Sequence, residues 1–406
     1  MSAPEFTGLA DPPRAETARR LRVLHVLSTI SLKRGGPSVA VRNMLRALHM
    51  RGVQADVVTT DDDGPNAHSS VPLGQFVELE NQRAIYFPRQ TNFYYASAPL
   101  ASWLSTHIGR YNIVHTHGLF AMAPIVAARL ARRRCIPYIM RPAGMLDSWS
   151  RAHRRPFLKR SSIALVEGPL LSSAARVHFT SQIELHQASE IGARIHSVVL
   201  PLGLDLDAPI STKAEIERFA PFADSKIVLF LSRIDYKKGL DVLIRAFAEI
   251  SSRHADAVLV IAGDGPPPLL AELRALAAEL NVAHRIFWLG FVQGDEKRWL
   301  LRRSALFALP SASENFGVAV AEAMAAGLPL ILSRGVALSE VVAKRNAGIV
   351  TDGSPRQVAE ALHTLLTDEP LRHRQGASAR QAAHEEFSLD LFGQRLETLY
   401  RTVLSR

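Results

Sequence analysis

Short apolar segments rich in Val, Ile and Leu alternate with amphipathic segments along most of the chain. Residues 21–30, 53–60 and 111–117 have the composition and length of buried strands, whereas residues 39–52 have the apolar spacing of a helix. This helix has Pro37 near its start and a glycine at its end, as helix-end chemistry prefers. The alternation predicts a parallel sheet of the doubly wound type, which places the chain in the α/β class.

The pattern stops over residues 201–225, which are rich in proline and turn residues, and then starts again. The second series of predicted strands covers residues 226–232, 257–263, 285–290, 305–310, 329–333 and 347–350. A chain of 406 residues is also long for one doubly wound sheet. We therefore expect two Rossmann-like domains, residues 21–205 and 206–385, that face a central cleft. Ligands of such sheets bind beyond the carboxyl ends of the strands.

Composition limits the environment of the protein. One cysteine, Cys135, excludes an intramolecular disulfide framework and fits a reducing compartment. Residues 1–20 carry prolines and charges where a signal peptide needs apolar residues, so we expect a flexible extension. No run of eighteen apolar residues occurs, so no transmembrane helix is expected. These features predict a cytoplasmic protein.

The formal net charge of +10 is concentrated in one part of the chain. Residues 129–160 contain nine arginines and one lysine but only one acidic residue, Asp147. Such a basic segment could bind nucleic acid, an anionic membrane or a phosphorylated substrate, or it could be a solvated face. It contains no recognisable nucleic-acid-binding motif, so we expect no nucleic-acid partner.

Two predicted strand ends carry groups suited to phosphate. Gly35 and Gly36 precede a helix whose free N–H groups can face an anion, although a plain turn explains them equally well. Arg233 and Lys238 follow the first strand of the second series and precede another helix. Two cations at a helix N-terminus suit a diphosphate and would stabilise its charge as a leaving group.

Acidic and histidine side chains follow other predicted strands. Glu314 lies on a loop and Glu322 on the helix after it, and carboxylates of this kind can accept pairs of sugar hydroxyl hydrogen bonds. His115 and His117 are two residues apart on one strand with no third ligand nearby in sequence, so no metal site is predicted. Residues 61–63, three consecutive aspartates, are interpreted as solvated loop acids.

The segments 310–317 and 322–329 resemble glycosyltransferase family 4, whose hallmark is P-S-x-x-E-x-F-G followed by E-A-M-A-x-G-x-P. The resemblance extends from the Gly-Gly loop to the C-terminal helix, residues 386–406, which in that family crosses back to the first domain. It implies a GT-B fold and retaining transfer of a hexose from a UDP- or GDP-sugar. It also implies that neither a cofactor nor a metal is needed.

The resemblance further implies roles for individual residues. Glu322 would bind the nucleotide ribose, and Glu314 would hold the transferred sugar, near which His117 would lie. Arg233 and Lys238 match the diphosphate clamp, so the catalytic set would be Glu314, His117, Arg233 and Lys238. The remaining donor contacts would come from Gly35, Gly36, Phe291, Val292, Asn315, Phe316 and Gly317, with Phe291 and Val292 at the base.

Residues 141–149 resemble a stretch, (H/R)-G-M-L-D-P-W, of family members that assemble bacterial polysaccharides. Cations and apolar anchors together can hold a helix at an anionic membrane. We expect an acceptor or membrane patch formed by Arg141, Trp149, Arg154, Arg155 and Lys159. The predicted acceptor is a saccharide, lipid-linked in this interpretation, and the predicted location is the inner face of the cell membrane.

The reaction itself has alternatives. No second flanking carboxylate is found for a double displacement, so a same-face mechanism is favoured. A nucleotide-sugar epimerase or a phosphorylase is possible on the same fold, although the sequence shows no lysine-bound cofactor site for a phosphorylase. A nucleic-acid-binding protein would leave Arg233, Lys238, Glu314 and Glu322 unexplained.

Overall fold

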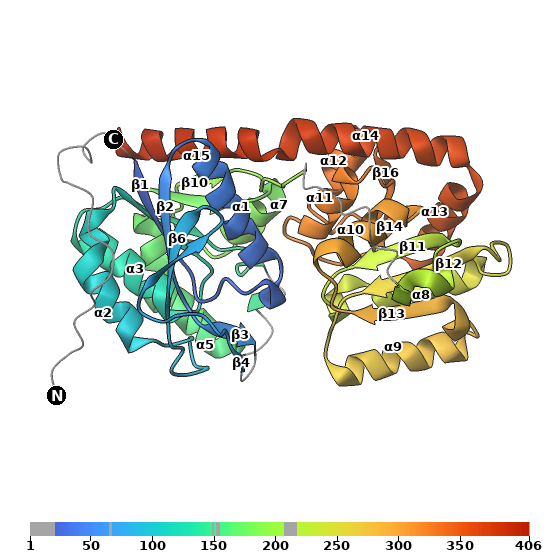
Figure 1. Ribbon diagram of the computed structural model, residues 1–406, viewed down its shortest axis with the longest axis horizontal. Coiled ribbons are helices and arrows are strands. Elements are labelled where there is room, and N and C mark those ends of the chain that lie inside the picture. The colour runs from blue at the N-terminus through green and yellow to red at the C-terminus, as the bar shows by residue number, and fades with distance from the viewer. Residues whose placement is uncertain (1–20, 65–66, 148–149, 152–154, 207–216, 406) are drawn as a thin grey trace. The chain divides into compact units, whose positions relative to one another are not determined.

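The computed structural model describes residues 21–405 apart from 65–66, 148–149, 152–154 and 207–216. The chain divides into two compact units (Figure 1). The first ends at Gly203 and also includes Leu389–Arg406, and the second comprises Leu204–Ser388. These boundaries lie two and three residues away from those expected from the sequence. The predicted N-terminal extension lies outside the described residues.

The first unit is built on an eight-stranded sheet in the order β10-β9-β8-β7-β1-β2-β6-β5. Neighbouring strands are parallel except β5 and β6, an antiparallel pair that the hydrophobic pattern did not reveal. The strands are β1 (Arg22–Val26), β2 (Gln54–Thr60), β5 (Phe76–Leu79), β6 (Gln82–Phe87), β7 (Ile113–His117), β8 (Tyr138–Arg141), β9 (Arg176–Phe179) and β10 (Ser197–Val199). A separate two-stranded sheet pairs β3 (Asp62–Gly64) with β4 (Ala67–His68).

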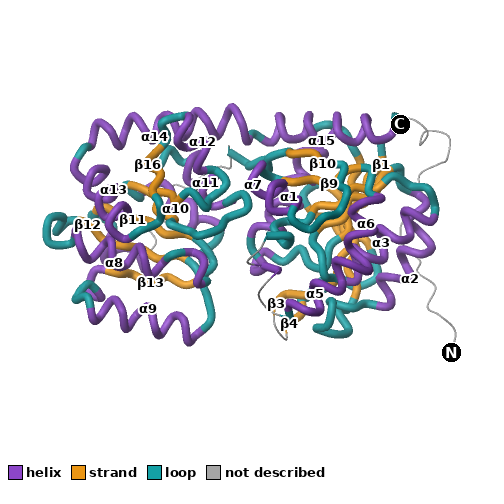
Figure 2. The backbone as a smooth tube through the Cα atoms, turned by 180° about the vertical axis from the view of Figure 1, so that it is seen from behind, coloured by secondary structure: helices purple, strands orange, loops and turns teal. Residues whose placement is uncertain are grey.

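Helices cover both faces of this sheet (Figure 2). They are α1 (Gly36–Met50), α2 (Ala98–His107), α3 (Met122–Arg133), α5 (Pro156–Ser162), α6 (Gly168–Ser173), α7 (Gln182–Ser189) and α15 (Leu389–Leu404). A five-residue π-helical segment, Ile163–Glu167, joins α5 to α6. The C-terminal helix α15 packs against α1, and a Cβ on Gly393 would lie 2.6 Å from the carbonyl oxygen of Ala47. The close approach of the two helices therefore depends on a glycine.

The second unit has a six-stranded, fully parallel sheet in the order β13-β12-β11-β14-β15-β16. Its strands are β11 (Lys226–Leu231), β12 (Ala257–Ala262), β13 (Ile286–Gly290), β14 (Leu306–Leu309), β15 (Leu330–Ser333) and β16 (Gly348–Thr351). All six lie within one residue of the predicted bounds. Its helices are α8 (Leu240–Ile250), α9 (Pro267–Glu279), α10 (Gly294–Arg303), α11 (Val318–Ala325), α12 (Ser339–Lys344), α13 (Pro355–Thr367) and α14 (Glu369–Phe387).

Each sheet has a switch point, where successive strands are added in opposite directions. In the first unit it lies between β1 and β7, and in the second between β11 and β14. Residues that follow these four strands occupy the position where doubly wound sheets bind ligands. The prediction of two doubly wound α/β domains is confirmed. Among the described residues, no helix is both long and apolar enough to cross a bilayer.

Candidate active site

Two loops at the switch point of the second unit are joined by hydrogen bonds. The loop after β11 ends in a short 3-10 helix, Tyr236–Lys238, directly before α8. The loop after β14 donates to it from the backbone N–H of Ala312 and from the hydroxyl of Ser311, at 2.7 and 2.9 Å from the Lys237 carbonyl oxygen. The two predicted site loops are therefore held together as one structure.

Lys238 and Glu314, 76 residues apart in sequence, form an ion pair between these loops. The Lys238 side chain is buried, whereas Glu314 is partly exposed. The Glu314 backbone is fixed at both ends, because its N–H donates to Gly335 and its carbonyl accepts from Ala337, each at 2.9 Å. The structure thus brings together two residues that the sequence predicted for the same site.

The electrostatic environment of Lys238 is unusual for a lysine. Burial, together with the neighbouring cations Lys237 and Arg233, lowers the pKa of Lys238 to about 7, whereas Asp235 acts in the opposite direction. Arg233 itself is 70% exposed and lies 3.9 Å from the Asp235 carboxylate. Arg233 is therefore open to solvent, whereas the Lys238 ammonium is held in a desolvated position.

Glu322 lies on α11 and is paired with a residue that the sequence did not point to. The Lys297 ammonium, on α10, donates to one Glu322 carboxylate oxygen at 2.7 Å. The helix α11 begins after Gly317, whose φ of 83° lies in the left-handed region. No sequence signal linked Lys297 to Glu322, because the two residues are 25 positions apart and an entire strand lies between them.

The other predicted donor contacts differ in exposure. The Phe316 side chain is buried and packs edge-on against Phe387, with ring centroids 5.5 Å apart, so only its backbone is available for a ligand. Phe291 is exposed, whereas Val292 is buried. Phe291 is therefore the more accessible of the two residues predicted near the base.

The switch point of the first unit contains a buried group of histidines. His117 ends β7, and its Nε2 shares a hydrogen bond of 2.9 Å with Nδ1 of His25 on β1. His115 lies opposite His25 in the strand register and bonds through Nδ1 to the Tyr400 hydroxyl of α15, also at 2.9 Å. His25 was not predicted from the sequence, although a histidine within an apolar strand is a signal that could have identified it.

A buried arginine adjoins this group. Arg141, at the end of β8, is 3% exposed, and its Nη1 lies 3.5 Å from Nδ1 of His117. Arg141 was predicted in an acceptor or membrane patch, and the membrane contact is wrong for this residue, because its side chain is buried. A contact of Arg141 with the acceptor stays a prediction. Burial is the main cause that lowers the pKa of His25 to about 3 and the pKa values of His115 and His117 well below normal, and Arg141 adds to it.

In the described part of the chain, one group has the spacing of metal ligands. His25, His115 and His117 each offer a nitrogen, and these atoms lie within 4.8 Å of one another. The third histidine, His25, is distant in sequence and comes from the neighbouring strand β1. However, the Arg141 guanidinium beside His117 would repel a cation, and no carboxylate belongs to the group. We therefore assign no metal here.

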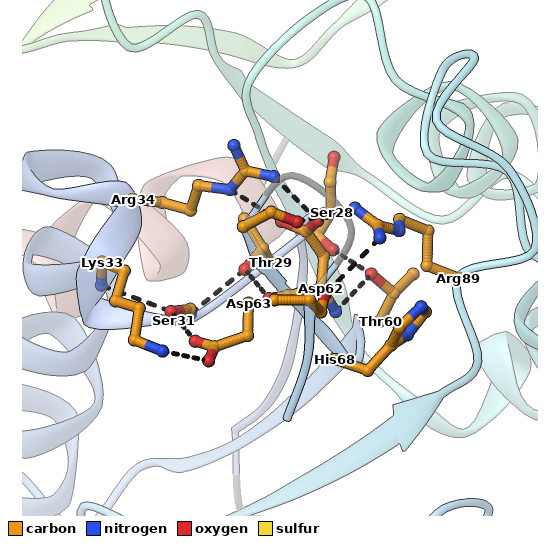
Figure 3. Close-up of polar contacts among 12 residues, drawn as sticks. Ser28, Thr29, Ser31, Lys33, Arg34, Thr60, Asp62, Asp63, His68 and Arg89 are labelled. Atoms are coloured by element: carbon orange, nitrogen blue, oxygen red, sulfur yellow. Dashed lines mark hydrogen bonds and ion pairs between the residues drawn. The ribbon is translucent and has the colours of Figure 1, made fainter. Parts of the chain in front are cut away.

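The three aspartates at 61–63 are not solvated loop acids, so that interpretation is wrong. Asp61 and Asp62 are buried. Asp62 pairs with Arg34 and Asp63 with Lys33, the two cations directly before the Gly35–Gly36 turn (Figure 3), whereas Asp61 accepts from the backbone N–H of Arg89. Gly35 has a φ of 80° and is the residue directly before α1. Two of the three acids therefore bind the residues that lead into the predicted phosphate loop.

The predicted acceptor or membrane patch is described in part. Trp149 and Arg154 lie outside the described residues. Arg155 is exposed, and the Lys159 ammonium lies 5.6 Å from the centre of the Phe120 ring. Phe157 of α5 is 85% exposed, and Leu165 of the π-helical segment that continues α5 is 77% exposed. Cationic and apolar groups therefore occur together on this surface.

Comparison with known proteins identifies the family. The model "Glycosyl transferase 4-like domain" matches residues 35–203, and the model "Glycosyl transferases group 1" matches residues 211–382. The chain is 28% identical to a D-inositol 3-phosphate glycosyltransferase of Xylanimonas cellulosilytica, over 92% of this chain and 93% of that protein. It is 31% identical to a GDP-mannose-dependent alpha-(1-6)-phosphatidylinositol monomannoside mannosyltransferase of Mycobacterium tuberculosis, over 53% of this chain and 58% of that protein.

Structural comparison agrees with this assignment. HepE of Anabaena, solved in complex with UDP and glucose, matches with a TM-score of 0.76 over 94% of this chain and 100% of that chain. At 18% identity, this similarity shows a shared fold. The two family models match the two α/β units in order, and a glycosyltransferase aligns with nearly the whole chain. The protein is therefore an enzyme that belongs to the GT-B glycosyltransferases of the family 4 type.

Proposed function

We propose that the enzyme transfers a hexose, with retention of configuration, from a UDP- or GDP-sugar to a hydroxyl of a saccharide acceptor. The observation that carries the proposal is the buried contact between Lys238 and Glu314 at the switch point of the second unit. A buried ammonium at the start of α8, beside exposed Arg233, suits a diphosphate, whose charge grows as it leaves. Glu314 would then be close to the sugar attached to that diphosphate.

In the proposed mechanism, the other predicted residues have the following roles. The departing diphosphate, neutralised by Arg233 and Lys238, would accept the proton of the acceptor hydroxyl on the same face of the sugar. Glu314 and His117 would position the sugar. Glu322 would accept hydrogen bonds from the ribose through the oxygen that Lys297 does not occupy. Because the cations neutralise the diphosphate, we propose that no metal or cofactor takes part.

The donor site is tested by nucleotide binding. Glu322→Gln is expected to weaken binding of UDP or GDP by about 10- to 100-fold, because a neutral amide replaces a carboxylate that accepts from hydroxyls. Binding is measured by calorimetry and thermal shift with a panel of UDP- and GDP-sugars, before and after treatment with EDTA. We expect one nucleotide class to bind, with no effect of EDTA.

The matched control is Glu360→Gln, an exposed glutamate paired with Arg356 on α13. It is expected to leave nucleotide affinity unchanged. If no nucleotide sugar binds the wild-type protein, or if Glu322→Gln binds as tightly as the wild type, the donor assignment is wrong. Loss of turnover after EDTA, restored by a metal, would overturn the metal-independent mechanism.

We further propose that the acceptor is lipid-linked and that the enzyme works at the inner face of the cell membrane, in the assembly of a cell-surface polysaccharide. The exposed Phe157 and Leu165, with exposed Arg155 and Arg160 on the same helical stretch, support this proposal. Apolar side chains can enter the interface while the guanidinium groups meet anionic lipid. The name of the M. tuberculosis relative also specifies a lipid-linked acceptor.

Membrane binding is tested by sedimentation with vesicles. The double variant Phe157→Ser, Leu165→Ser is expected to bind vesicles that contain phosphatidylglycerol at least tenfold more weakly than the wild type, because two exposed apolar side chains are lost. Phe93→Ser, which removes another exposed phenyl ring of the first unit, is the control and should not change binding. Equal binding by the double variant and the wild type would exclude this helix as the membrane contact.

A further inference from the structure

Asp62 connects the loop after β1 to the rest of the first unit. The Arg34 guanidinium donates two hydrogen bonds to the Asp62 carboxylate, from Nε and Nη2, each at 2.8 Å (Figure 3). Arg89 forms a second ion pair with the same carboxylate and also donates to the Gly64 carbonyl oxygen at 3.1 Å. The Asp62 side chain is fully buried, so the carboxylate that accepts the two parallel hydrogen bonds from Arg34 is shielded from water.

Further contacts hold the same loop along its length. The Thr29 hydroxyl donates to the Asp62 carbonyl oxygen at 2.7 Å, and the Ser31 hydroxyl donates to the Asp63 carboxylate at 2.5 Å. The Lys33 ammonium donates to the other Asp63 oxygen at 2.6 Å. The hydrogen bond with Lys33 is the main cause that holds the pKa of Asp63 below its usual value. The segment that leads to Gly35 is therefore attached to β3 at several points.

Each of the three aspartates in this cluster has a partner. Lys33 pairs with Asp63, and Arg34 and Arg89 both pair with Asp62. The Asp61 carboxylate accepts a hydrogen bond from the backbone N–H of Arg89 and lies 3.0 Å from Nδ1 of His68. Although Lys33 and Arg34 directly precede the glycine turn, their charged ends are already bound to aspartates. The turn can therefore bind an anion through its backbone N–H groups. In the described part of the chain, the N–H of Gly36 has no acceptor, and Pro37 has no N–H.

We infer that Asp62 is a positioning residue, which acts through Arg34 to hold the Gly35–Gly36 turn in the conformation that presents the Gly36 N–H to a donor phosphate. This inference rests on the proposed function, because the anion is taken to be the diphosphate of the nucleotide sugar. A phosphate contact from a fixed N–H needs no rearrangement when the ligand binds. If the turn were not tethered, the entropy cost of ordering it on binding would reduce the affinity for the donor.

Two variants test the inference in the full-length enzyme. Arg34→Gln removes the paired hydrogen bonds but leaves the Asp62–Arg89 pair, so the fold should be retained. Asp62→Asn weakens both pairs. In each variant, hydrogen exchange of the backbone amides at residues 28–38, measured without nucleotide, is expected to be at least tenfold faster than in the wild type. The KM for the donor is expected to rise about tenfold with kcat within twofold, as for loss of a contact made equally in the ground and transition states.

Two further variants act as controls. Arg34→Lys retains the charge but not the paired geometry and should restore only part of the donor affinity. Arg51→Gln, which removes an ion pair with Glu397 at the other end of α1, should leave both exchange at residues 28–38 and the donor KM unchanged.

If exchange at residues 28–38 is unchanged in Arg34→Gln and Asp62→Asn, then Asp62 and Arg34 do not hold the turn in place, whatever the donor is. Faster exchange with an unchanged KM would overturn the positioning role, because the turn would then be mobile without effect on binding. These outcomes can be distinguished from failure of the proposed function, which would appear as unchanged nucleotide affinity in Glu322→Gln. The exchange measurement needs no nucleotide and is therefore informative in either case.

Discussion

Lys238→Met is expected to lower kcat/KM by about 10³-fold without lowering the free energy of unfolding. Removing one preorganised group that stabilises transition-state charge typically costs about 10²- to 10³-fold, and this ammonium is buried beside Glu314, where charge interactions are strong. Stability is retained because burial lowers the pKa of Lys238 to about 7, which means that the folded protein holds the ammonium less well than the unfolded chain does. Turnover of the donor and urea unfolding measure the two effects.

The sign of the pH dependence follows from the same shift. A lysine whose pKa is lowered in the folded state makes an unfavourable contribution to folding. This contribution is fully present below pH 7 and disappears as the pH rises towards 10.5, the unfolded value. In the free enzyme the ammonium loses its proton near pH 7, so kcat/KM should fall above that pH. Lys238→Arg keeps a charged group and should remove this fall. A wild-type profile that stays flat from pH 6 to 9 would contradict the assignment.

Gly239→Ala is expected to destabilise the protein by about 3 kcal/mol and to remove most of the activity. Gly239 has a φ of +67°, and an added Cβ would lie 2.1 Å from the Pro310 carbonyl oxygen, which begins the Glu314 loop. Left-handed backbone costs an alanine about 1–2 kcal/mol, and overpacking adds about 1–3 kcal/mol. Because the two site loops would be pushed apart at this point, the contact between Lys238 and Glu314 should be lost. Denaturant unfolding and donor kinetics test both effects.

Gly52→Ala provides a matched control within the same chain. Gly52 also has a φ of +67°, but nothing lies within 4 Å of its added Cβ. This variant should show only the cost of left-handed backbone, about 1–2 kcal/mol, with normal turnover. If Gly239→Ala is no less stable than Gly52→Ala and remains active, close approach at Pro310 is not what positions the two loops.

Local pattern was sufficient for much of the fold. The strands of the second unit were predicted within one residue because strands of a parallel sheet are continuous apolar runs between helical segments. This holds even for the edge strands β13 and β16, which are only partly buried. Arg233, Lys238 and Glu314 could be placed at strand ends for the same reason, since the carboxyl ends of parallel strands form one edge. The antiparallel pair of β5 and β6 escaped prediction, because Phe76–Leu79 is only partly buried and lacks that pattern.

Pairings between distant residues were decided only by the tertiary structure. The sequence showed three consecutive aspartates, but not that Arg34 and Arg89 both pair with Asp62, because these partners lie 28 and 27 positions away in other segments. It showed Arg141 among surface cations, whereas the sheet buries it beside His117. Periodicity specifies which positions are buried within an element. Which charges meet depends on strand order and register, and these are set by packing across the whole unit.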